Sequence, residues 1–229
     1  MSTSSVAVEP RNEDWKNTIL AGLANYIDAG TIVAGSAALV LWQEAYNLDN
    51  SLIGMIGAFG PNAISAGVGA MIGGRLGHLF ARKKIHQNDK LFYAFGMLWL
   101  VFAINSWMLV LGFFLVGLAV GADIPASWSL IAEMAPKDGR GKHSGVAQVL
   151  WYLGPVVVLL MFLVLAPLGL LGARIVFAQL AILAIGLTFL RSRMQESKRW
   201  LEAQEAAPKG QVQQGRVRDL FTRQHIGSM

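Results

Sequence analysis

Two aspartates stand inside long apolar stretches of the sequence, where an ionisable side chain is costly and therefore informative. Asp28 lies 10 residues after Thr18, the start of the first stretch. At about 1.5 Å per helical residue, it would lie roughly 15 Å into a bilayer, near the middle. We expect no basic residue at that depth, so Asp28 is a candidate for reversible protonation and for binding a polar ligand. The alternative is that it only hydrogen-bonds Asn25, Tyr26 or a neighbouring helix.

Asp123 and Glu133 are the acidic residues of another apolar stretch, and both lie toward its C-terminal end. Basic residues follow between Lys137 and Lys142. We expect both carboxylates to pair with this basic segment at a helix end, which is a structural role.

The residue types present argue against an enzyme. Without Cys there is no thiolate metal site, disulfide or cysteine nucleophile. Phosphate-binding Gly-x-x-x-x-Gly-Lys and Gly-x-Ser-Gly motifs are also missing from the sequence. All the histidines are expected outside the apolar stretches and without metal-ligand spacing: His78, His86, His143 and His225. We therefore expect no catalytic residues, no metal and no cofactor.

The composition predicts an all-α membrane protein. Of 229 residues, 54% are hydrophobic and only 14% are charged, and the mean hydropathy is +0.48. Soluble domains carry about 25% charged residues. A membrane-spanning helix needs roughly 20 apolar residues, and six stretches approach this length: Thr18–Trp42, Leu52–Gly73, Leu91–Ile104, Met108–Ala132, Val146–Leu168 and Ile175–Leu190. The third is the weakest, and Asn105 with Ser106 predicts a tight turn after it.

The basic residues predict how the six spans are oriented. If the N-terminal tail is cytoplasmic, every one of the 19 Lys and Arg residues except Arg174 falls on the cytoplasmic side. The first outer loop carries Glu44 and Asp49 instead. This bias follows the positive-inside rule, so the net charge of +5 indicates a bilayer partner and no nucleic acid. We expect a multi-pass protein of the inner or plasma membrane with both termini in the cytoplasm.

Small residues are dense in the second and fourth stretches. Close helix packing explains them better than a substrate path, because small residues let helices approach in lipid. Pro61, Pro125 and Pro155 lie inside spans, where proline removes a backbone donor and bends a helix. The glycines are Gly54, Gly57, Gly60, Gly67, Gly69, Gly73, Gly74, Gly112, Gly117 and Gly121.

Several motifs resemble the N-terminal half of a major facilitator superfamily transporter, closest to the sugar-porter branch. The run Gly74-Arg-Leu-Gly-His-Leu-Phe-Ala-Arg-Lys83 is similar to the family signature between helices two and three. The segment Glu196-Ser-Lys-Arg-Trp-Leu201 resembles the one that follows helix six, and Arg174 falls where the family has an arginine at the start of that helix. The sugar-porter pattern of helix four and its loop is matched by Gly117, Gly121, Pro125, Glu133, Pro136, Arg140 and Gly141.

The resemblance, which covers about residues 18 to 201, implies a six-helix bundle made of a 3+3 inverted repeat. It implies a sugar or polyol as substrate, with proton-coupled or facilitative transport. Gln148 stands six residues before Gly154, the spacing of a sugar-contacting glutamine, so Gln148 and Asp28 are the expected substrate-binding residues. The implied cytoplasmic gating residues are Gly74, Arg75, Gly77, Arg82, Lys83, Glu133, Arg140, Glu196 and Arg199.

Three residues depart from the family pattern. His78 replaces an acidic residue and Leu79 a basic one in the first signature, and Phe113 replaces the arginine at the start of helix four. In the family these charges latch two six-helix halves together on the cytoplasmic side. We therefore expect a weaker latch in this protein.

The chain is expected to divide into a cytoplasmic tail (1–17), a six-helix membrane domain (18–192) and a cytoplasmic tail or linker (193–229). The main interpretation is the N-terminal half of a secondary transporter that works with a complementary six-helix C-terminal half or with a second copy. Two alternatives stay open. One is a truncated six-helix protein that does not transport, and the other is a docking partner of other membrane proteins.

Overall fold

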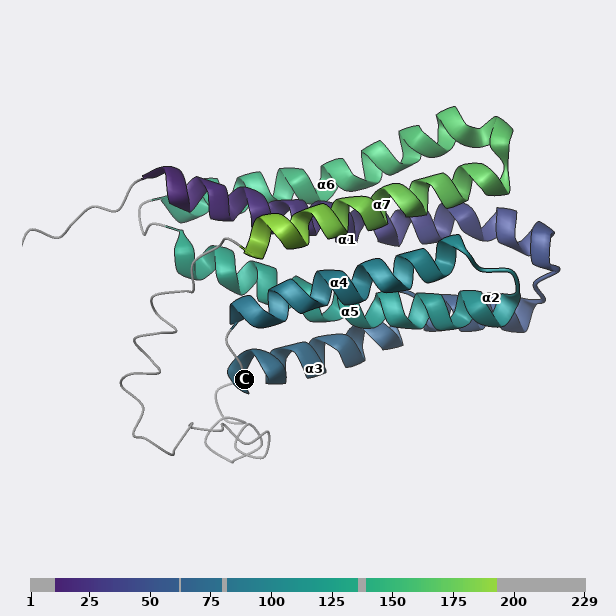
Figure 1. The fold of residues 1–229 in the computed structure, drawn as a ribbon, viewed down its shortest axis with the longest axis horizontal. Helices are drawn as coiled ribbons and strands as arrows, with labels where there is room; N and C mark the ends of the chain where they lie inside the picture. Colours follow the sequence, from purple (N-terminus) through teal and green to yellow (C-terminus); the bar gives the residue numbers. More distant parts are fainter. Residues whose placement is uncertain (1–10, 62, 80–81, 136–138, 193–229) are drawn as a thin grey trace, which may run out of the picture. The chain divides into compact units, whose positions relative to one another are not determined.

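The computed structural model describes residues 11–61, 63–79, 82–135 and 139–192, and within these ranges all regular structure is helical. The predicted all-α class is confirmed. Figure 1 shows the helices lying side by side in a bundle. Their bounds are α1 (Arg11–Tyr46), α2 (Asn50–Ala58), α3 (Ile64–Leu79), α4 (Arg82–Val101), α5 (Ser106–Met134), α6 (Arg140–Leu165), the short 3-10 helix η2 (Ala166–Leu168) and α7 (Leu170–Ser192).

Side-chain caps explain where two of the helices begin. The Asn105 Oδ1 atom accepts a hydrogen bond from the Met108 backbone N–H at 2.9 Å and caps α5. This cap confirms the predicted turn between the third and fourth spans. The Asp49 carboxylate caps α2 in the same way, accepting from the Leu52 N–H at 2.7 Å.

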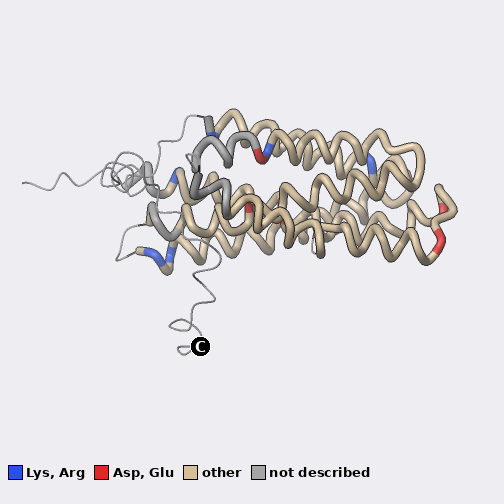
Figure 2. Tube along the Cα trace, turned by 90° about the horizontal axis from the view of Figure 1, so that it is seen from below, with Lys and Arg blue, Asp and Glu red and all other residues tan. Residues whose placement is uncertain are grey.

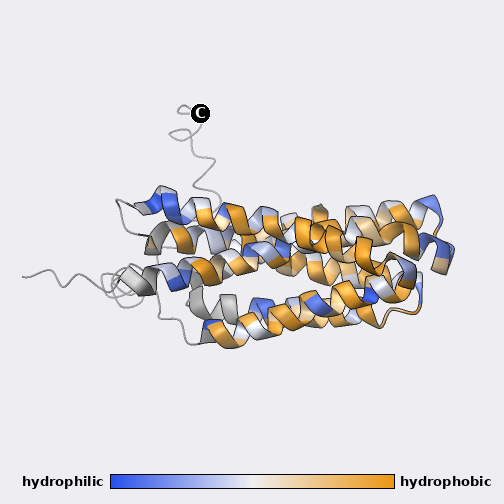
Figure 3. Cartoon of the chain, turned by 90° about the horizontal axis from the view of Figure 1, so that it is seen from above, coloured by the Kyte–Doolittle hydropathy of each residue, from blue (hydrophilic) through white to orange (hydrophobic). Residues whose placement is uncertain are grey.

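Four helical segments in the described chain are long and apolar enough to cross a membrane: Trp15–Tyr46, Ser106–Ile131, Arg140–Leu168 and Leu170–Arg191. Figure 3 shows the apolar residues concentrated along the middle of the bundle and the polar ones toward its ends. The remaining two predicted spans correspond to the α2–α3 pair and to α4. The first of these two spans is divided into two helices, and the second begins in a charged segment.

The predicted second span is broken into two helices around Pro61. Helix α2 ends at Ala58 and α3 begins at Ile64, because a proline cannot donate the backbone hydrogen bond that continues a helix. The Ser65 hydroxyl donates to the carbonyls of Phe59 and Gly60, at 2.8 and 2.9 Å. These bonds satisfy carbonyl groups that the break leaves without a helical partner.

The predicted third span is shifted toward the N-terminus. Helix α4 begins at Arg82 and ends at Val101, whereas the apolar stretch pointed to Leu91–Ile104. The first turns of α4 contain many charged residues, so the hydropathy of the sequence predicts a loop there. The segment is nevertheless helical, because α4 packs against α5 and α7 and buries Lys90.

Glycines bring α3 directly against α5. A Cβ atom at Gly69 or Gly121 would overlap the backbone of the opposite helix, at Leu118 and Ala66 respectively. These two glycines confirm the expected role of small residues in close helix packing. Four others, in contrast, face open space within the bundle, so packing inside it does not explain them: Gly54, Gly57, Gly67 and Gly74.

Arg174 of α7 joins the end of α1 and the loop between α4 and α5 at one end of the bundle. Its Nη2 atom donates to the Ala103 carbonyl at 2.9 Å and to the Tyr46 hydroxyl at 3.1 Å. Tyr46 also donates to the Ala103 carbonyl, at 2.7 Å. Figure 2 shows acidic residues in the loop at this end and most of the described basic residues toward the opposite end.

Candidate functional site

Asp28 of α1 forms a buried ion pair with Lys90 of α4. The Lys90 Nζ atom lies 2.6 Å from Asp28 Oδ1, and both side chains are fully buried. The prediction that Asp28 lacks a basic partner at its depth is therefore wrong. The reason is the shift of α4: the apolar stretch begins only at Leu91, whereas Lys90 lies two turns inside a helix that begins at Arg82.

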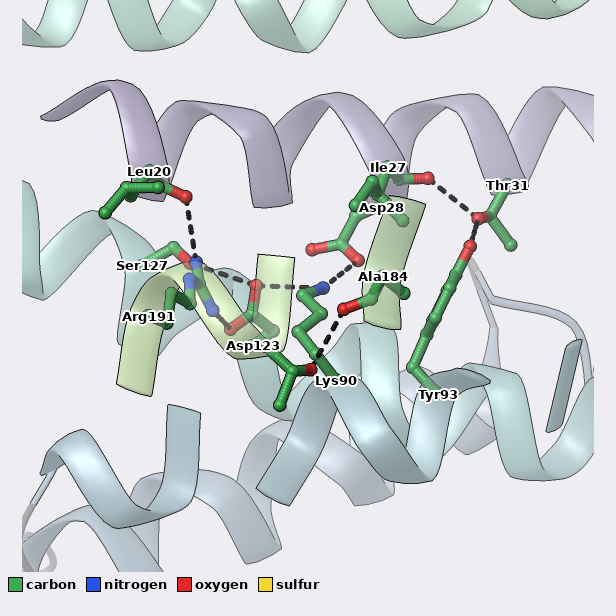
Figure 4. A network of polar contacts seen from close by, with 11 residues as sticks. Leu20, Ile27, Asp28, Thr31, Lys90, Tyr93, Asp123, Ser127, Ala184 and Arg191 are labelled. Carbon is green, nitrogen blue, oxygen red and sulfur yellow. Dashed lines mark hydrogen bonds and ion pairs between the residues drawn. The ribbon is translucent and has the colours of Figure 1, made fainter. Parts of the chain in front are cut away.

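Lys90 also contacts a second carboxylate, Asp123 of α5, at 3.1 Å from Oδ2. The Ser127 hydroxyl donates to the same oxygen at 3.0 Å, and Arg191 of α7 donates to Asp123 Oδ1 at 3.3 Å. Asp123 thus pairs with residues of other helices, and the expectation that it pairs with the Lys137–Lys142 segment is wrong. We call Asp28, Lys90, Asp123 and Arg191 the buried charge cluster (Figure 4).

The last turn of α7 places Arg191 in the interior. This guanidinium is 1% exposed and donates to the Leu20 carbonyl of α1 at 3.4 Å and to the Ser127 hydroxyl at 3.5 Å. The planar, multiply donating guanidinium suits such a position between several acceptors. Arg191 therefore connects α1, α5 and α7 through one side chain.

A polar pair extends the cluster along α1 and α4. The Thr31 hydroxyl donates to the Ile27 carbonyl at 2.7 Å and contacts the Tyr93 hydroxyl, with both side chains buried. The Tyr93 ring lies 5.1 Å from the Lys90 Nζ atom, within cation–π range. Lys90 is consequently held by two carboxylates and the face of an aromatic ring.

Burial determines what this arrangement is able to do chemically. A buried charge is tolerated only when it is paired and hydrogen-bonded, and removing one partner of a buried pair costs about 3–5 kcal/mol. Asp28 keeps one oxygen, Oδ2, that is buried and has no hydrogen-bond partner among the described residues. The site therefore combines a shared cation with a carboxylate oxygen that is available to a proton or a polar ligand.

The structure does not bring Gln148 and Asp28 together. Gly30 of α1 lies against Gly154 and Val158 of α6, so α6 packs on that face of α1. Asp28 points to α4 and α5 instead, on the opposite side of α1. Gln148 is partly exposed on α6, and no hydrogen bond joins it to Asp28 among the described side chains.

His143 also differs from expectation. It lies in the first turn of α6, is buried, and shares a 2.5 Å hydrogen bond with the Thr18 hydroxyl. Its ring stacks on Trp15 at 4.1 Å between centroids. Its role is packing between α1 and α6, and no group of metal-ligating side chains is found among the described residues.

The expected gating residues fall partly outside what the structure describes. Arg140, the first residue of α6, and Gly74 of α3 are exposed. The structure does not describe the side chains of four other gating residues: Arg75, Arg82, Lys83 and Glu133. The surroundings of Gly77 and the whole of Glu196 and Arg199 also lie outside the described residues. The side chains of His78 and Leu79 are likewise outside this description.

The third family departure, Phe113, has a clear structural setting. It is buried and packs edge-to-face on Trp42 at 5.4 Å, with its ring against Gly35. An apolar residue therefore fills a site that is apolar among the described residues.

A model of the Major Facilitator Superfamily matches residues 18–226. The chain belongs to this superfamily. It is accordingly a multi-pass membrane protein, and neither the family nor its relatives are enzymes.

Two relatives of this major facilitator chain are named as a polyol and a sugar transporter. The minor myo-inositol transporter IolF of Bacillus subtilis (strain 168) is 52% identical over 185 residues, covering 81% of this chain and 42% of IolF. The glucose transporter GlcP of Staphylococcus epidermidis (strain ATCC 12228 / FDA PCI 1200) is 28% identical over 186 residues, covering 80% of this chain and 39% of GlcP. The chain thus spans less than half the length of these two relatives.

Solved structures show the same fold. The partially occluded inward-open xylose transporter XylE from E. coli superposes with a TM-score of 0.76 at 22% identity, over 83% of this chain and 52% of XylE. The predicted bundle, one half of the major facilitator fold, is confirmed by this likeness.

Lys90, Ser127 and Arg191 were not predicted as site residues. Lys90 and Arg191 each lie just outside a predicted span, directly before Leu91 and directly after Leu190. A signal for them exists in the sequence: each cation directly adjoins an apolar stretch, so even a short extension of each helix includes it, and basic residues inside membrane helices are rare without an acidic partner.

Proposed function

We propose that this chain supplies a six-helix half of a transporter for a sugar or polyol, with myo-inositol as the first candidate. The 52% identity to the minor myo-inositol transporter IolF carries this proposal, because it extends over 185 residues of the helical region. The buried charge cluster supports proton coupling, since carboxylates inside membrane helices are typical of proton relays.

The proposed substrate contact is Gln148 on α6. An amide offers donors and an acceptor, the groups that match sugar hydroxyls. The side chain is partly exposed, so it is open to a ligand that approaches α6. Asp28, on the other side of α1, then serves the proton rather than a substrate bound to Gln148.

A second six-helix bundle is part of the proposal. Substrate sites of such transporters lie near the bilayer midplane between two repeats. The partner is a complementary six-helix half or a second copy of this chain. Both termini are proposed to be cytoplasmic, which places the gating residues on the cytoplasmic side as the charge bias predicts.

Uptake into proteoliposomes tests the proposal. The full chain is reconstituted alone and after co-expression with the part of IolF that this chain does not match, and uptake of labelled myo-inositol, glucose and xylose is measured. We expect saturable uptake, highest for myo-inositol, only with the second bundle present. If the chain alone is dimeric and shows saturable uptake, the partner bundle is a second copy. If the chain alone is monomeric and shows saturable uptake, the proposed need for two bundles is contradicted.

Absence of uptake in both preparations, with both proteins folded, would overturn the transport proposal. It would favour the alternative of a six-helix protein that does not transport. Circular dichroism and gel filtration of the same preparations provide the folding control.

A further inference from the structure

Asn25 of α1 has a buried side-chain amide without a hydrogen-bond partner. The residue is 0% exposed, and neither its Nδ2 nor its Oδ1 atom bonds to a described residue. A buried amide that makes no hydrogen bond destabilises a protein, so such a group calls for a physical explanation. Asp28 follows one turn later, but the two side chains are not bonded to each other. The donor and the acceptor of Asn25 are therefore both free to bind a group from outside the described chain.

Asn25 lies on the side of α1 between α6 and α5. Three residues earlier, Gly22 faces α6, where a Cβ atom would meet the Leu150 side chain. Three residues later, Asp28 points to Lys90, on the side where α4 and α5 pack. Residues three apart in a helix are about 60° apart around its axis. Asn25 therefore lies midway between these two directions.

The same side of α1 opens toward the C-terminal end of the helix. Residues seven and eleven positions after Asn25 return to within about 20° of it around the axis. These are Ile32, which is half-buried, and Ser36, which is exposed and donates to the Ile32 carbonyl at 3.2 Å. We call Asn25, Ile32 and Ser36 the Asn25 face. Among the described residues, this face leads from an exposed hydroxyl to a buried amide.

Gln148 of α6 stands on the same side of the α1–α6 pair as Asn25. The two helices run in the same direction, because the contacts between them advance along both: Thr18 with His143, Gly22 with Ala147, and Gly30 with Val158. Viewed from the N-terminal ends, residues of a right-handed helix follow one another clockwise. Asn25 lies about 60° anticlockwise from Gly22, and Gln148 lies about 100° clockwise from Ala147. On two parallel helices that face each other, these opposite rotations lead to the same side.

The two amides also lie at a similar depth. Gly22 contacts Ala147, so Gln148 is level with about the next residue of α1, two positions before Asn25. Two helical residues correspond to about 3 Å along the axis. One amide on α1 and one on α6 therefore border the same space between the two helices and α5.

We propose that Asn25 is a second substrate-binding residue, which together with Gln148 binds the hydroxyl groups of a polyol. An amide offers two donors and an acceptor, so it is able to bind neighbouring hydroxyls at once. The inference rests on the proposed function, to which it adds a residue and a basis for specificity. Because the amide is enclosed in this arrangement, a hydroxyl reaches it only when α5 or α6 moves slightly away from α1.

An unpartnered amide makes the site selective. A site built to hydrogen-bond a substrate hydroxyl rejects an analogue that lacks it, because the buried polar groups of the protein then stay unpaired. Asn25 should accordingly distinguish myo-inositol from a deoxyinositol that lacks the hydroxyl facing it. A residue with a purely structural role would not make this distinction.

Equilibrium binding of labelled myo-inositol tests the proposal, with the full chain alone and co-expressed with the part of IolF that it does not match. We expect Asn25→Ala to weaken binding about two- to twelvefold for each hydrogen bond lost. Deoxyinositols that each lack one hydroxyl are compared as competitors. We expect the wild type to bind one of them less tightly than myo-inositol, and Asn25→Ala to bind that one and myo-inositol equally.

Asn17→Ala is the matched control, because Asn17 is the same residue type in the same helix but is half-buried. It should leave binding unchanged. Thermal unfolding without ligand supplies a second readout: Asn25→Ala removes an unpartnered amide, so its midpoint should equal or exceed that of the wild type. A lower midpoint would show that the bundle itself uses the amide, and would overturn the proposal.

Single cysteines test the Asn25 face with the amide intact, since the chain contains no cysteine of its own. A membrane-impermeant thiol reagent attacks only thiolates in contact with water. We expect it to label Ser36→Cys and Ile32→Cys, and we expect myo-inositol to slow the labelling of Ile32→Cys. Ile182→Cys is the control, because Ile182 is 67% exposed on α7 in an apolar span and should face lipid, without labelling.

Each remaining outcome counts for or against the inference. Equal binding by wild type and Asn25→Ala, an unchanged deoxyinositol profile, or labelling of Ile32→Cys that myo-inositol does not slow would overturn it. If Asn25→Ala fails to fold by circular dichroism, the cysteine labelling still decides. Binding that depends on Asn25 without any uptake would refute the proposed transport alone, and uptake that Asn25→Ala leaves unchanged would refute only this inference.

Discussion

Gly154 of α6 lies directly against the backbone carbonyl of Tyr26 in α1, so closely that a Cβ atom at position 154 would overlap the carbonyl oxygen. The contact sits where α1 and α6 pack along each other. We predict that Gly154→Ala destabilises the bundle by about 1–3 kcal/mol, the usual cost of overpacking.

Gly145→Ala is the control for that prediction. Gly145 lies in the same helix, but a Cβ atom there meets nothing within 4 Å. Alanine is favoured over glycine in a helix by about 1 kcal/mol. Thermal unfolding in detergent should therefore show a lower midpoint for Gly154→Ala and an equal or higher one for Gly145→Ala. Equal midpoints for Gly154→Ala and the wild type would contradict the close contact.

Asp28→Asn should separate coupling from transport. The amide is similar in size to the carboxyl but cannot carry a proton, and it leaves Lys90 paired with Asp123. In a transport-competent assembly, we predict loss of accumulation against a gradient, while exchange of labelled for unlabelled substrate continues. Uphill uptake by this variant, or failure to insert and fold, would leave Asp28 with a structural role only.

Gln148→Ala should weaken substrate binding without uncoupling the proton. The amide lies on α6, away from the buried charge cluster, so its loss leaves the ion pairs intact. Losing one hydrogen bond costs about 0.5–1.5 kcal/mol, or roughly a two- to twelvefold rise in the half-saturation concentration. Uptake kinetics with and without a pH gradient measure both effects. Ser144→Ala, one turn earlier in α6, is the control and should leave the half-saturation concentration unchanged.

The charge bias predicts where reporters will be active. Cytoplasmic reporters fused after Lys84, Gly141 and Leu201 should be active, and periplasmic reporters should be active after Asp49 and Leu170. Alkaline phosphatase and green fluorescent protein fusions at the same five positions provide the two readouts. Activity of one reporter type at both Lys84 and Asp49 would rule out the proposed orientation.

The local properties of the chain were readable from its sequence. Apolar stretches long enough to cross a bilayer predicted the helices, since the hydrocarbon core imposes length and composition on each span. Asn105 predicted a turn because its side chain caps the next helix, and the structure contains that cap. The expectation that glycines pack helices together was confirmed at Gly69 and Gly121.

Only the tertiary structure decided which charges meet. Asp28, Lys90, Asp123 and Arg191 are far apart along the chain, and hydropathy placed both cations in loops, whereas helix packing buries them together. The same packing sets Asp28 and Gln148 on different sides of α1, which their shared polarity could not reveal. A single sequence records how apolar each segment is, but the direction of a side chain within a bundle depends on the helices that surround it.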